Sequence, residues 1–314
     1  MDKPLVRILV WLSLMAVLTL LTMGGWLLAG GDTSSVTGLK WLQLLQTVAT
    51  FLVPSVVGAW LWSDDHSPFR WLKLTNHKNE VNRALAAEKS QIIIVALATM
   101  ICALPAINLL ADLNSRVVLP DCMAGLEATL RAQEEAAARL TERFLQADDL
   151  FTLLINIGLM ALLPALAEEI TFRGTLQQII SPSSFHLSFS SYRTHLAIWL
   201  SAIVFSAIHL QFYGFVPRML MGAMFGYVFV WSGSLWLPVL MHATNNTIAV
   251  VTYYIAAHSE SGRELLADNR TWADTIGTGP MWWLGVVSLL LTLALLFLIR
   301  KKSTAANPAN PSNI

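Results

Sequence analysis

Two adjacent carboxylates and an arginine lie inside a long, mostly apolar run. Glu168, Glu169 and Arg173 all fall between Leu150 and Ile180. Each ionised side chain near the centre of a membrane-spanning helix costs about 2.5–3.5 kcal/mol on insertion scales, so function is the default explanation for such groups. Glu169 and Arg173 are four residues apart and can form an ion pair on one helix face. Glu168 lies about 100° around the helix from Glu169, which leaves its carboxylate free for another role.

Histidine and asparagine side chains recur in later apolar segments. Glu168 and Glu169 are the only acidic residues inside the spans that we predict, and His209 and His242 lie in two later spans. Asn246 follows His242 by four residues and projects from the same face. Ionisable groups in a membrane face the interior of the helix bundle. With a rise of 1.5 Å per residue along each span, Glu168, His209 and His242 all come out in the inner half of the membrane. We therefore predict one buried cluster of Glu168, His209 and His242. Taken singly, each side chain could instead be a hydrogen-bonding group between helices.

Prolines and glycines suggest where these helices bend and pack. Pro164 and Pro238 each precede a residue of the cluster by four positions, and each can kink its helix by removing a hydrogen bond. Prolines are also common in membrane helices for no catalytic reason. Gly222 and Gly226 form a GxxxG pair, which predicts close helix packing.

The composition predicts an all-α, polytopic membrane helix bundle. The chain has 314 residues, of which 55% are hydrophobic and only 13% charged. Charged residues make up about a quarter of an ordinary soluble domain. The net charge is zero, and the absence of a long basic run argues against a nucleic-acid partner. We expect the lipid bilayer as a partner and a single domain over residues 1–302, with the motif-bearing core at 150–256 and a disordered tail at 303–314.

A membrane-spanning helix needs about 20 apolar residues. About eight segments meet or approach this length: Ile8–Ala29, Leu42–Trp62, Gln91–Ala111, Leu150–Thr171, Ala197–Phe212, Val216–Trp231, Leu235–Ala256 and Met281–Ile299. Eight spans place both termini on one side, and the distribution of Lys and Arg favours the cytoplasm. Between spans, Ser63–Ser90 has aromatic and basic residues suited to the membrane interface. Met123–Gln146 has the spacing of an amphipathic helix on the outer face of the bundle.

Three short motifs together resemble one protein family. In order they are Glu168-Glu169-x-x-x-Arg173, Phe205-x-x-x-His209 and His242-x-x-x-Asn246. They are similar to the motifs of the CPBP intramembrane proteases, which comprise CAAX prenyl endoproteases and bacteriocin-processing, or Abi, proteins. The resemblance implies an intramembrane endopeptidase whose site opens toward the cytoplasm. It also implies a peptide or protein substrate, in some members lipidated, and a bacterial inner-membrane location.

The resemblance implies a hydrolytic role for each motif residue. Glu168 would activate a water held against His209, while His242 and Asn246 would stabilise the oxyanion that forms at the scissile carbonyl. Glu169, paired with the arginine of its motif, would hold the helix face and tune Glu168.

An alternative scheme, that of a metalloprotease, uses zinc or another divalent metal. Glu168, His209 and His242 would then be the ligands and Glu169 the base, because three protein ligands and a water form the usual open zinc site. The sequence has no HExxH motif, so no single helix presents a histidine pair. We favour the glutamate-activated water, with no cofactor.

Two other function classes are compatible with such a bundle. A non-proteolytic scaffold or bacteriocin-immunity protein would keep the fold, but it would have no need for Glu168 with both histidines. A proton-coupled transporter would use the same side chains as a relay. Transporters commonly show paired repeats with broken helices, and this sequence shows none.

Overall fold

The computed structural model describes residues 3–75, 83–181, 190–267 and 270–306. These segments contain helices and no strand, which confirms the all-α prediction. Six helical segments of the described chain are long and apolar enough to cross a membrane. They are α1 (Pro4–Leu28), α2–η1–α3 (Val36–Gln46, Thr47–Leu52, Val53–Trp62), α5 (Arg83–Ser115), α7–η3–α8–η4–α9 (Leu150–Asn156, Ile157–Leu162, Leu163–Glu169, Ile170–Gln177, Gln178–Ile180), α11 (Phe215–Ser232) and α15 (Trp282–Ala306).

The other two predicted spans are also helical. They correspond to α10 (Ser190–Ala207) and α12 (Trp236–Ala257), which carry the histidine motifs. Shorter elements connect these helices: α4 (Pro68–Trp71), η2 (Asp121–Met123), α6 (Ala124–Leu145), α13 (Glu260–Ala267), α14 (Trp272–Thr275) and η5 (Gly279–Met281). The predicted number of about eight membrane helices is thus consistent with the structure.

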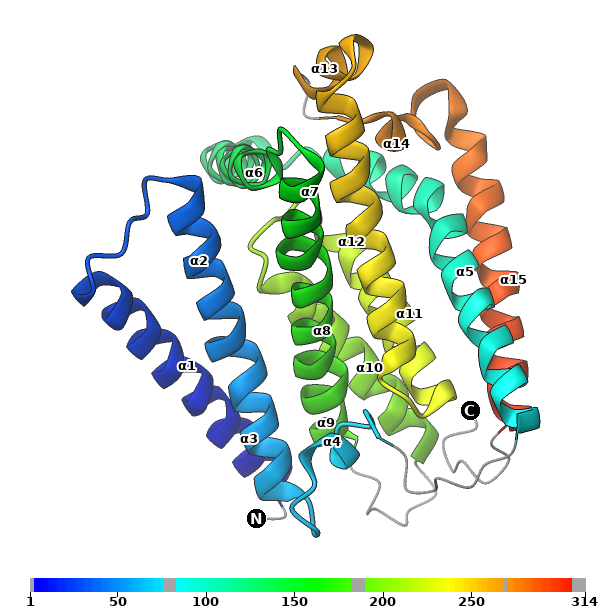
Figure 1. Cartoon of the computed structure of the whole chain (residues 1–314). Coiled ribbons are helices and arrows are strands. Elements are labelled where there is room, and N and C mark those ends of the chain that lie inside the picture. The colour runs from blue at the N-terminus through cyan, green and yellow to red at the C-terminus, as the bar shows by residue number, and fades with distance from the viewer. Residues whose placement is uncertain (1–2, 76–82, 182–189, 268–269, 307–314) are drawn as a thin grey trace.

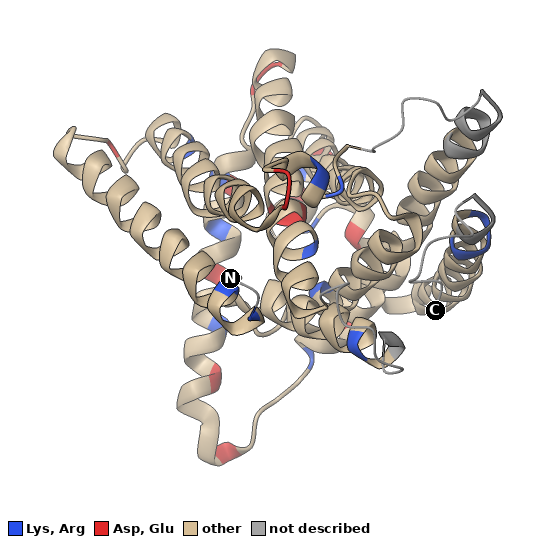
Figure 2. Ribbon diagram, turned by 90° about the horizontal axis from the view of Figure 1, so that it is seen from below, with Lys and Arg blue, Asp and Glu red and all other residues tan. Residues whose placement is uncertain are grey.

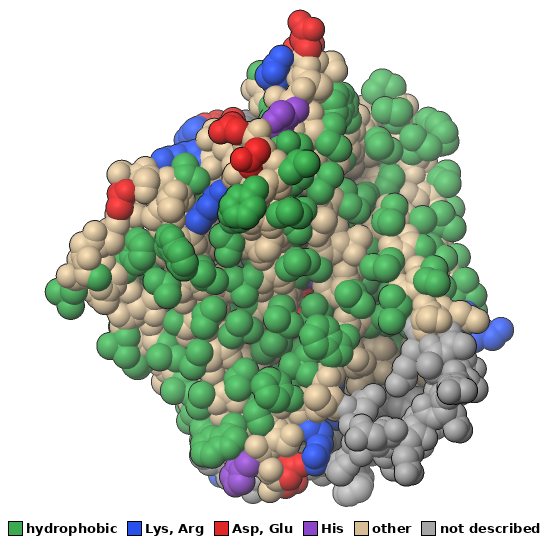
Figure 3. All heavy atoms as spheres, in the orientation of Figure 1, with side chains coloured by type: hydrophobic (Ala, Val, Ile, Leu, Met, Phe, Trp, Pro, Cys, Tyr) green, Lys and Arg blue, Asp and Glu red, His purple; other side chains and the backbone are tan. Residues whose placement is uncertain are grey.

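The surface of the bundle is that of an integral membrane protein. Large exposed hydrophobic side chains run along the outer helices, for example Leu20 in α1, Ile94 in α5 and Leu290 in α15. Figure 3 shows them as a broad apolar band, with charged side chains at its two ends. Viewed along the bundle in Figure 2, many of the charged residues lie near the centre and along one projecting helix, and most of the ribbon at the rim is tan. A lipid environment accounts for this inverted pattern.

The helices place the predicted core in the middle of the bundle. In Figure 1, α8, α10, α11 and α12 lie between the α1–α3 hairpin on one side and the α5–α15 pair on the other. The start of α1 and the end of α15 lie at the same end of the bundle, and α6 crosses the opposite end. Met100, Phe225, Met241 and Ile299 from four different helices form the largest buried apolar cluster, which fixes α12 against the α5–α15 pair.

Helix irregularities coincide with prolines, although not always as expected. The π-helical segments η1 and η3 end two residues before Pro54 and Pro164, so the extra residue in each π turn accommodates the proline. Pro238 is the third residue of α12, in its first turn. No helix hydrogen bond is lost there because the first N–H groups of a helix have no intrahelical partner. The predicted kink at Pro238 is therefore wrong.

Three segment boundaries differ from the sequence-based expectation. α10 ends at Ala207 and not at Phe212, and the turn that follows holds Leu210 at a φ of 54°. Part of the expected interfacial segment 63–90 packs inside the bundle, since Leu72 is fully buried; its residues 76–82 lie outside the described residues. α15 continues to Ala306, and the remainder of the predicted disordered tail, 307–314, lies outside the described residues as well.

The amphipathic helix expected at 123–146 is α6. It lies across the end of the bundle and contacts it through a few side chains. Glu134 accepts a hydrogen bond from the backbone N–H of Tyr213 at 2.8 Å, and Arg131 lies 4.4 Å above the centre of the Tyr213 ring. Phe144 is its buried anchor. α6 thereby covers the loop that joins α10 to α11.

Candidate active site

A fully buried ion pair joins α8 to the segment that follows it. Arg173 Nη1 donates to Glu169 Oε1 at 2.8 Å, and neither side chain is exposed. Arg173 Nη2 donates to the carbonyl oxygen of Gly222 at 2.8 Å. The guanidinium also lies 4.7 Å from the ring centre of Phe205 and 5.5 Å from that of Phe225. The predicted pairing is confirmed, and the arginine additionally ties the acidic motif to α11.

The GxxxG pair of α11 makes this contact possible. A Cβ atom at Gly222 would lie 3.1 Å from Arg173 Nη2 and 3.3 Å from Cα of Ala202. A Cβ at Gly226 would lie 2.8 Å from Gln177 Oε1, and Gln177 Nε2 donates to the Gly226 carbonyl at 3.3 Å. The close packing predicted for this pair is confirmed. It allows two polar side chains, four residues apart, to bond successive turns of α11.

The two glutamates have different surroundings. Glu169 is completely buried, whereas the Glu168 side chain is 19% exposed. The helix changes to the π-helical segment η4 immediately after Glu169, where Thr175 Oγ1 donates to the carbonyl of Ile170, five residues earlier. Wide turns of this kind occur frequently at functional sites. Glu169 is thus held by the protein, and Glu168 keeps access to a small molecule.

His242 lies between the two carboxylates. Its Nδ1 is 2.9 Å from Glu169 Oε1, and its Nε2 is 3.8 Å from Glu168 Oε2. The ring stacks on Phe225 at 5.2 Å between ring centres. Since a carboxylate accepts hydrogen bonds, Nδ1 carries the proton in this contact. Nε2 then faces Glu168, so the residue that we predicted to join Glu168 also anchors to Glu169.

His209 is held by the helix end that precedes it. Its Nδ1 is 2.8 Å from the carbonyl oxygen of Phe205, which can only accept, so the proton lies on Nδ1 and Nε2 is free to accept. The ring meets the Phe205 ring edge-on at 5.2 Å, and His242 meets the same ring at 5.9 Å. The two predicted histidines therefore flank one phenylalanine.

Asn246 lies one helical turn beyond His242 on α12. Its Oδ1 accepts a hydrogen bond from Asn245 Nδ2 at 3.2 Å. This contact occupies the acceptor of the Asn246 amide and leaves its N–H groups as donors. That orientation suits stabilisation of a negative oxygen.

Arg218 is a charged residue near the site that sequence reasoning missed. Its Nη2 donates to Gln211 Oε1 at 2.7 Å, while its buried Nη1 has no hydrogen-bond partner among the described residues. The guanidinium interacts electrostatically with Glu168 and His209. A charged residue soon after the FxxxH motif is a signal that could have suggested a role for Arg218 in the site. The direction of the Arg218 side chain, however, depends on the turn after α10.

The described side chains do not form the group of ligands that the metalloprotease scheme requires. Each histidine donates its Nδ1 proton to a carboxylate or carbonyl, as metal-ligating histidines usually do. Within the described part of the chain, however, no three His, Cys, Asp or Glu side chains are grouped closely enough to hold an ion. Glu168, His209 and His242 do not fit a metal in this structure, and we derive no step through one.

Comparisons with known proteins match the segment that contains these residues. Residues 150–248 match the family model described as type II CAAX prenyl endopeptidase Rce1-like. The uncharacterized protein YpbD of Bacillus subtilis (strain 168) is 28% identical over 91 residues, which are 28% of this chain and 40% of that protein. No solved structure matches the chain significantly. The family resemblance read from the three motifs is confirmed, because the matched residues 150–248 contain all three motifs.

Proposed function

We propose that the chain is an intramembrane endopeptidase that hydrolyses a peptide bond of a membrane-associated substrate with a water activated by Glu168. The observation that carries this proposal is the division between the two glutamates. Glu169 is buried and bonded to Arg173 and His242, whereas Glu168 is 19% exposed with its carboxylate 3.8 Å from His242 Nε2. One carboxylate is structural, and the other is available to a water.

In this proposal, Glu168 and the Nε2 atom of His209 are the two acceptors for the water. Glu168 takes one proton as the water attacks the scissile carbonyl, and the unprotonated Nε2 of His209 orients the second O–H. The proton held by Glu168 then passes to the leaving amine, so the carboxylate is regenerated. The Arg218 guanidinium interacts electrostatically with Glu168 and is a further cationic group near the proposed water.

The developing negative charge on the carbonyl oxygen needs fixed donors. The free N–H groups of Asn246 supply them, because its acceptor oxygen is occupied by Asn245. His242 can donate from Nε2 as well when both of its nitrogens carry protons. Glu169 holds this ring in place through Nδ1. Arg173 in turn holds Glu169, so the ion pair positions the histidine and does not touch the substrate.

The setting of the site favours a substrate that lies in the bilayer. Figure 3 shows a small opening at mid-height of the apolar face, at which acidic and histidine atoms are visible. A membrane peptide or a lipidated peptide is the substrate class that reaches such a depth. We also propose that the protein acts in a bacterial inner membrane with cytoplasmic termini.

Cleavage of a mixed membrane-peptide library by the purified, detergent-solubilised protein tests the proposal. Glu168→Gln and His242→Ala should each lower the initial rate at least about 100-fold, the range expected for a general base or an oxyanion donor. Glu135→Gln is the matched control, because Glu135 is exposed on α6 and pairs only with Arg139 among the described residues. Its rate should equal that of the wild type.

A chelator arm of the same assay separates the two chemical schemes. Dialysis against a chelator should leave the wild-type rate unchanged if water is activated by Glu168 alone. Loss of activity with recovery on adding zinc would instead favour the metalloprotease scheme. Two results together would favour the scaffold or immunity role over the protease. They are a folded wild-type protein that cleaves no peptide and a Glu168→Gln strain with the wild-type cellular phenotype.

A further inference from the structure

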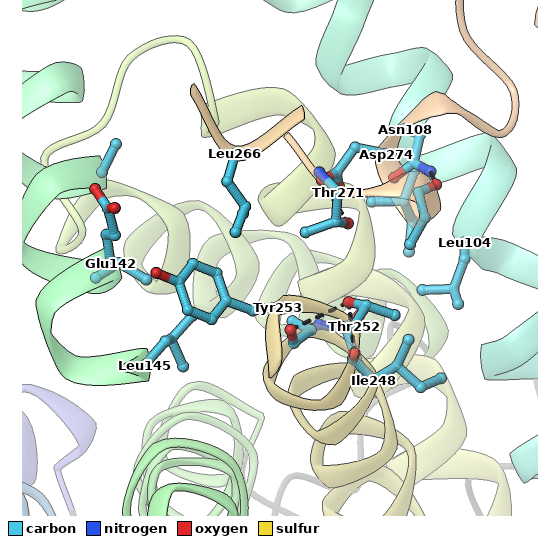
Figure 4. A pocket seen from close by; sticks show the side chains of 16 residues that line it. Leu104, Asn108, Glu142, Leu145, Ile248, Thr252, Tyr253, Leu266, Thr271 and Asp274 are labelled. Atoms are coloured by element: carbon cyan, nitrogen blue, oxygen red, sulfur yellow. Dashed lines mark hydrogen bonds between the residues drawn. The ribbon is translucent and has the colours of Figure 1, made fainter. Parts of the chain in front are cut away.

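A cavity of about 320 Å³ lies beside α12, at the end of the bundle where α6 crosses. Helices α5, α6, α12, α13 and α14 enclose it (Figure 4). Its volume is at the lower end of the range of about 300–1,000 Å³ that is usual for ligand pockets. None of the motif residues lines it, so the proposed reaction leaves this cavity unexplained.

The inner end of the cavity adjoins the candidate active site. Asn245 lines it and donates to Asn246 Oδ1 at 3.2 Å. Asn245 is also only three residues, or about 4.5 Å along the helix axis, from His242. From there the cavity follows α12 past Ile248 to Tyr253. A group in this cavity can therefore belong to the same substrate chain whose peptide bond lies at Asn246.

The walls of the cavity are mainly aliphatic. Leu104 and Ile107 of α5, Leu145 of α6, Ile248 of α12 and Leu266 of α13 all contribute to the lining. Side chains of this kind accept the methylene groups of a ligand and give it no hydrogen bonds. An occupant must therefore have a substantial apolar stem.

The charges on the lining are exclusively negative. Glu142 and Asp274 are its carboxylates, and neither lysine nor arginine is among the described lining residues. Asp274 is already occupied, because its Oδ2 accepts from the backbone N–H and the hydroxyl of Thr271 at 2.7 and 2.9 Å. Fixed donors thus partly compensate Asp274, and Glu142 is the less satisfied of the two carboxylates.

Glu142 is half-buried and has no bonded partner for its carboxylate among the described residues. Figure 4 shows Glu142 on the same side of the cavity as Tyr253, and the two side chains interact electrostatically. An unpaired carboxylate at the edge of an apolar cavity attracts a cation and repels an anion. The Tyr253 phenol oxygen adds a second acceptor on that side of the cavity.

We propose that this cavity is a specificity subsite for a lysine or arginine side chain of the peptide substrate. Such a side chain combines a long methylene stem, which the aliphatic walls accept, with a cationic end, which Glu142 meets. The inference rests on the proposed function, since it assumes that the substrate is a peptide held at α12. It adds that the substrate carries a basic residue near the bond that is cut.

Matched peptides that differ by Lys, Gln or Glu at single positions around the cleaved bond test the subsite. At one position the wild type should prefer Lys over Gln about tenfold in kcat/KM. Glu142→Gln should reduce that ratio to about twofold or less, and Glu142→Lys should reverse the preference toward Glu. Glu135→Gln, on the exposed face of the same helix, should keep the wild-type ratio. An unchanged ratio in Glu142→Gln, or no preference in the wild type, would overturn the subsite.

Binding measured without turnover distinguishes failure of the subsite from failure of the proposed function. The Glu168→Gln protein should bind labelled Lys peptides about tenfold more tightly than Gln peptides by fluorescence anisotropy. Selective binding that Glu142→Gln removes, without any cleavage by the wild type, would retain the subsite and reject the protease. Cleavage by the wild type, with equal binding of the Lys and Gln peptides, would retain the protease and reject the subsite. Ala249→Phe fills the cavity without changing its charge and should also abolish the preference.

Discussion

Replacing Arg173 with methionine should lower the free energy of unfolding by about 3–5 kcal/mol, the usual cost of leaving a buried charge without its partner. The structure explains why this site should lie in that range. The N–O distance of the Glu169–Arg173 pair is 2.8 Å, and neither side chain is exposed. At an effective dielectric constant of about 20, two unit charges at this distance attract each other by about 6 kcal/mol. Desolvation of both ions offsets part of that attraction.

A double-mutant cycle isolates the contribution of the pair. Glu169→Gln alone also weakens the contact with His242 Nδ1, so both single variants should be destabilised. In the double variant no buried charge is left unpaired, and its loss should be smaller than the sum of the single losses by about 2 kcal/mol or more. Unfolding in mixed micelles of increasing SDS fraction, followed by tryptophan fluorescence, measures these differences.

Arg139→Met serves as the matched control for this cycle. Arg139 pairs with Glu135 at 3.4 Å, but both side chains are more than half exposed. Such pairs contribute little, and the substitution should cost less than about 0.5 kcal/mol. The reasoning would be refuted if Arg173→Met cost no more than Arg139→Met, or if the two single losses at the buried pair were additive to within about 0.5 kcal/mol.

Two further predictions concern packing and pH. Gly226→Leu should destabilise the bundle by about 1–3 kcal/mol in the same unfolding assay, because a Cβ atom there would lie 2.8 Å from Gln177 Oε1. Gly158→Ala is the control and should be nearly neutral, because no atom lies within 4 Å of the new Cβ. The hydrogen bond from the Thr152 backbone N–H lowers the pKa of the Asp149 carboxyl below 3.8. The stabilisation from Asp149 is therefore present above pH 3.8 and is lost as the pH falls through the lowered folded-state pKa. The Tm difference between wild type and Asp149→Ala should shrink over that interval, and a difference that stayed constant would contradict this assignment.

The sequence was sufficient to predict which helices form and which polar residues matter locally. The Glu169–Arg173 pair follows from a spacing of four residues, and the contact at Gly222 from a GxxxG pair, because both depend on helix geometry alone. The apolar runs predicted the positions of the membrane helices for a similar reason. In a membrane every backbone group must be bonded within the helix, which leaves few alternatives.

Tertiary contacts account for what could not be predicted. The unpaired Arg218 Nη1 and the early end of α10 depend on a turn that holds Leu210 at positive φ. Nothing in the local pattern distinguishes that turn from a continuing helix. The sequence predicted that His242 would lie with Glu168, but its shorter contact, at 2.9 Å, is with Glu169. The packing of α8 on α12 selects that carboxylate, and a spacing of more than 70 residues in the sequence does not reveal it. The proposed roles of Glu168, His209 and Asn246 remain predictions.

Leu72 has a consequence for the order in which the protein is assembled during synthesis. A Cβ atom on Gly174 would lie 3.1 Å from the Leu72 side chain. Nearby, Trp236 Nε1 at the start of α12 donates a hydrogen bond to the carbonyl oxygen of Leu74, and these two residues are 162 positions apart. At about 5–20 residues per second, the ribosome needs on the order of ten seconds to make the chain between those two contacts. The first helical hairpin is therefore in the membrane well before the helices that enclose Leu72 exist. This end of the bundle can therefore close only after the start of α12 has been made.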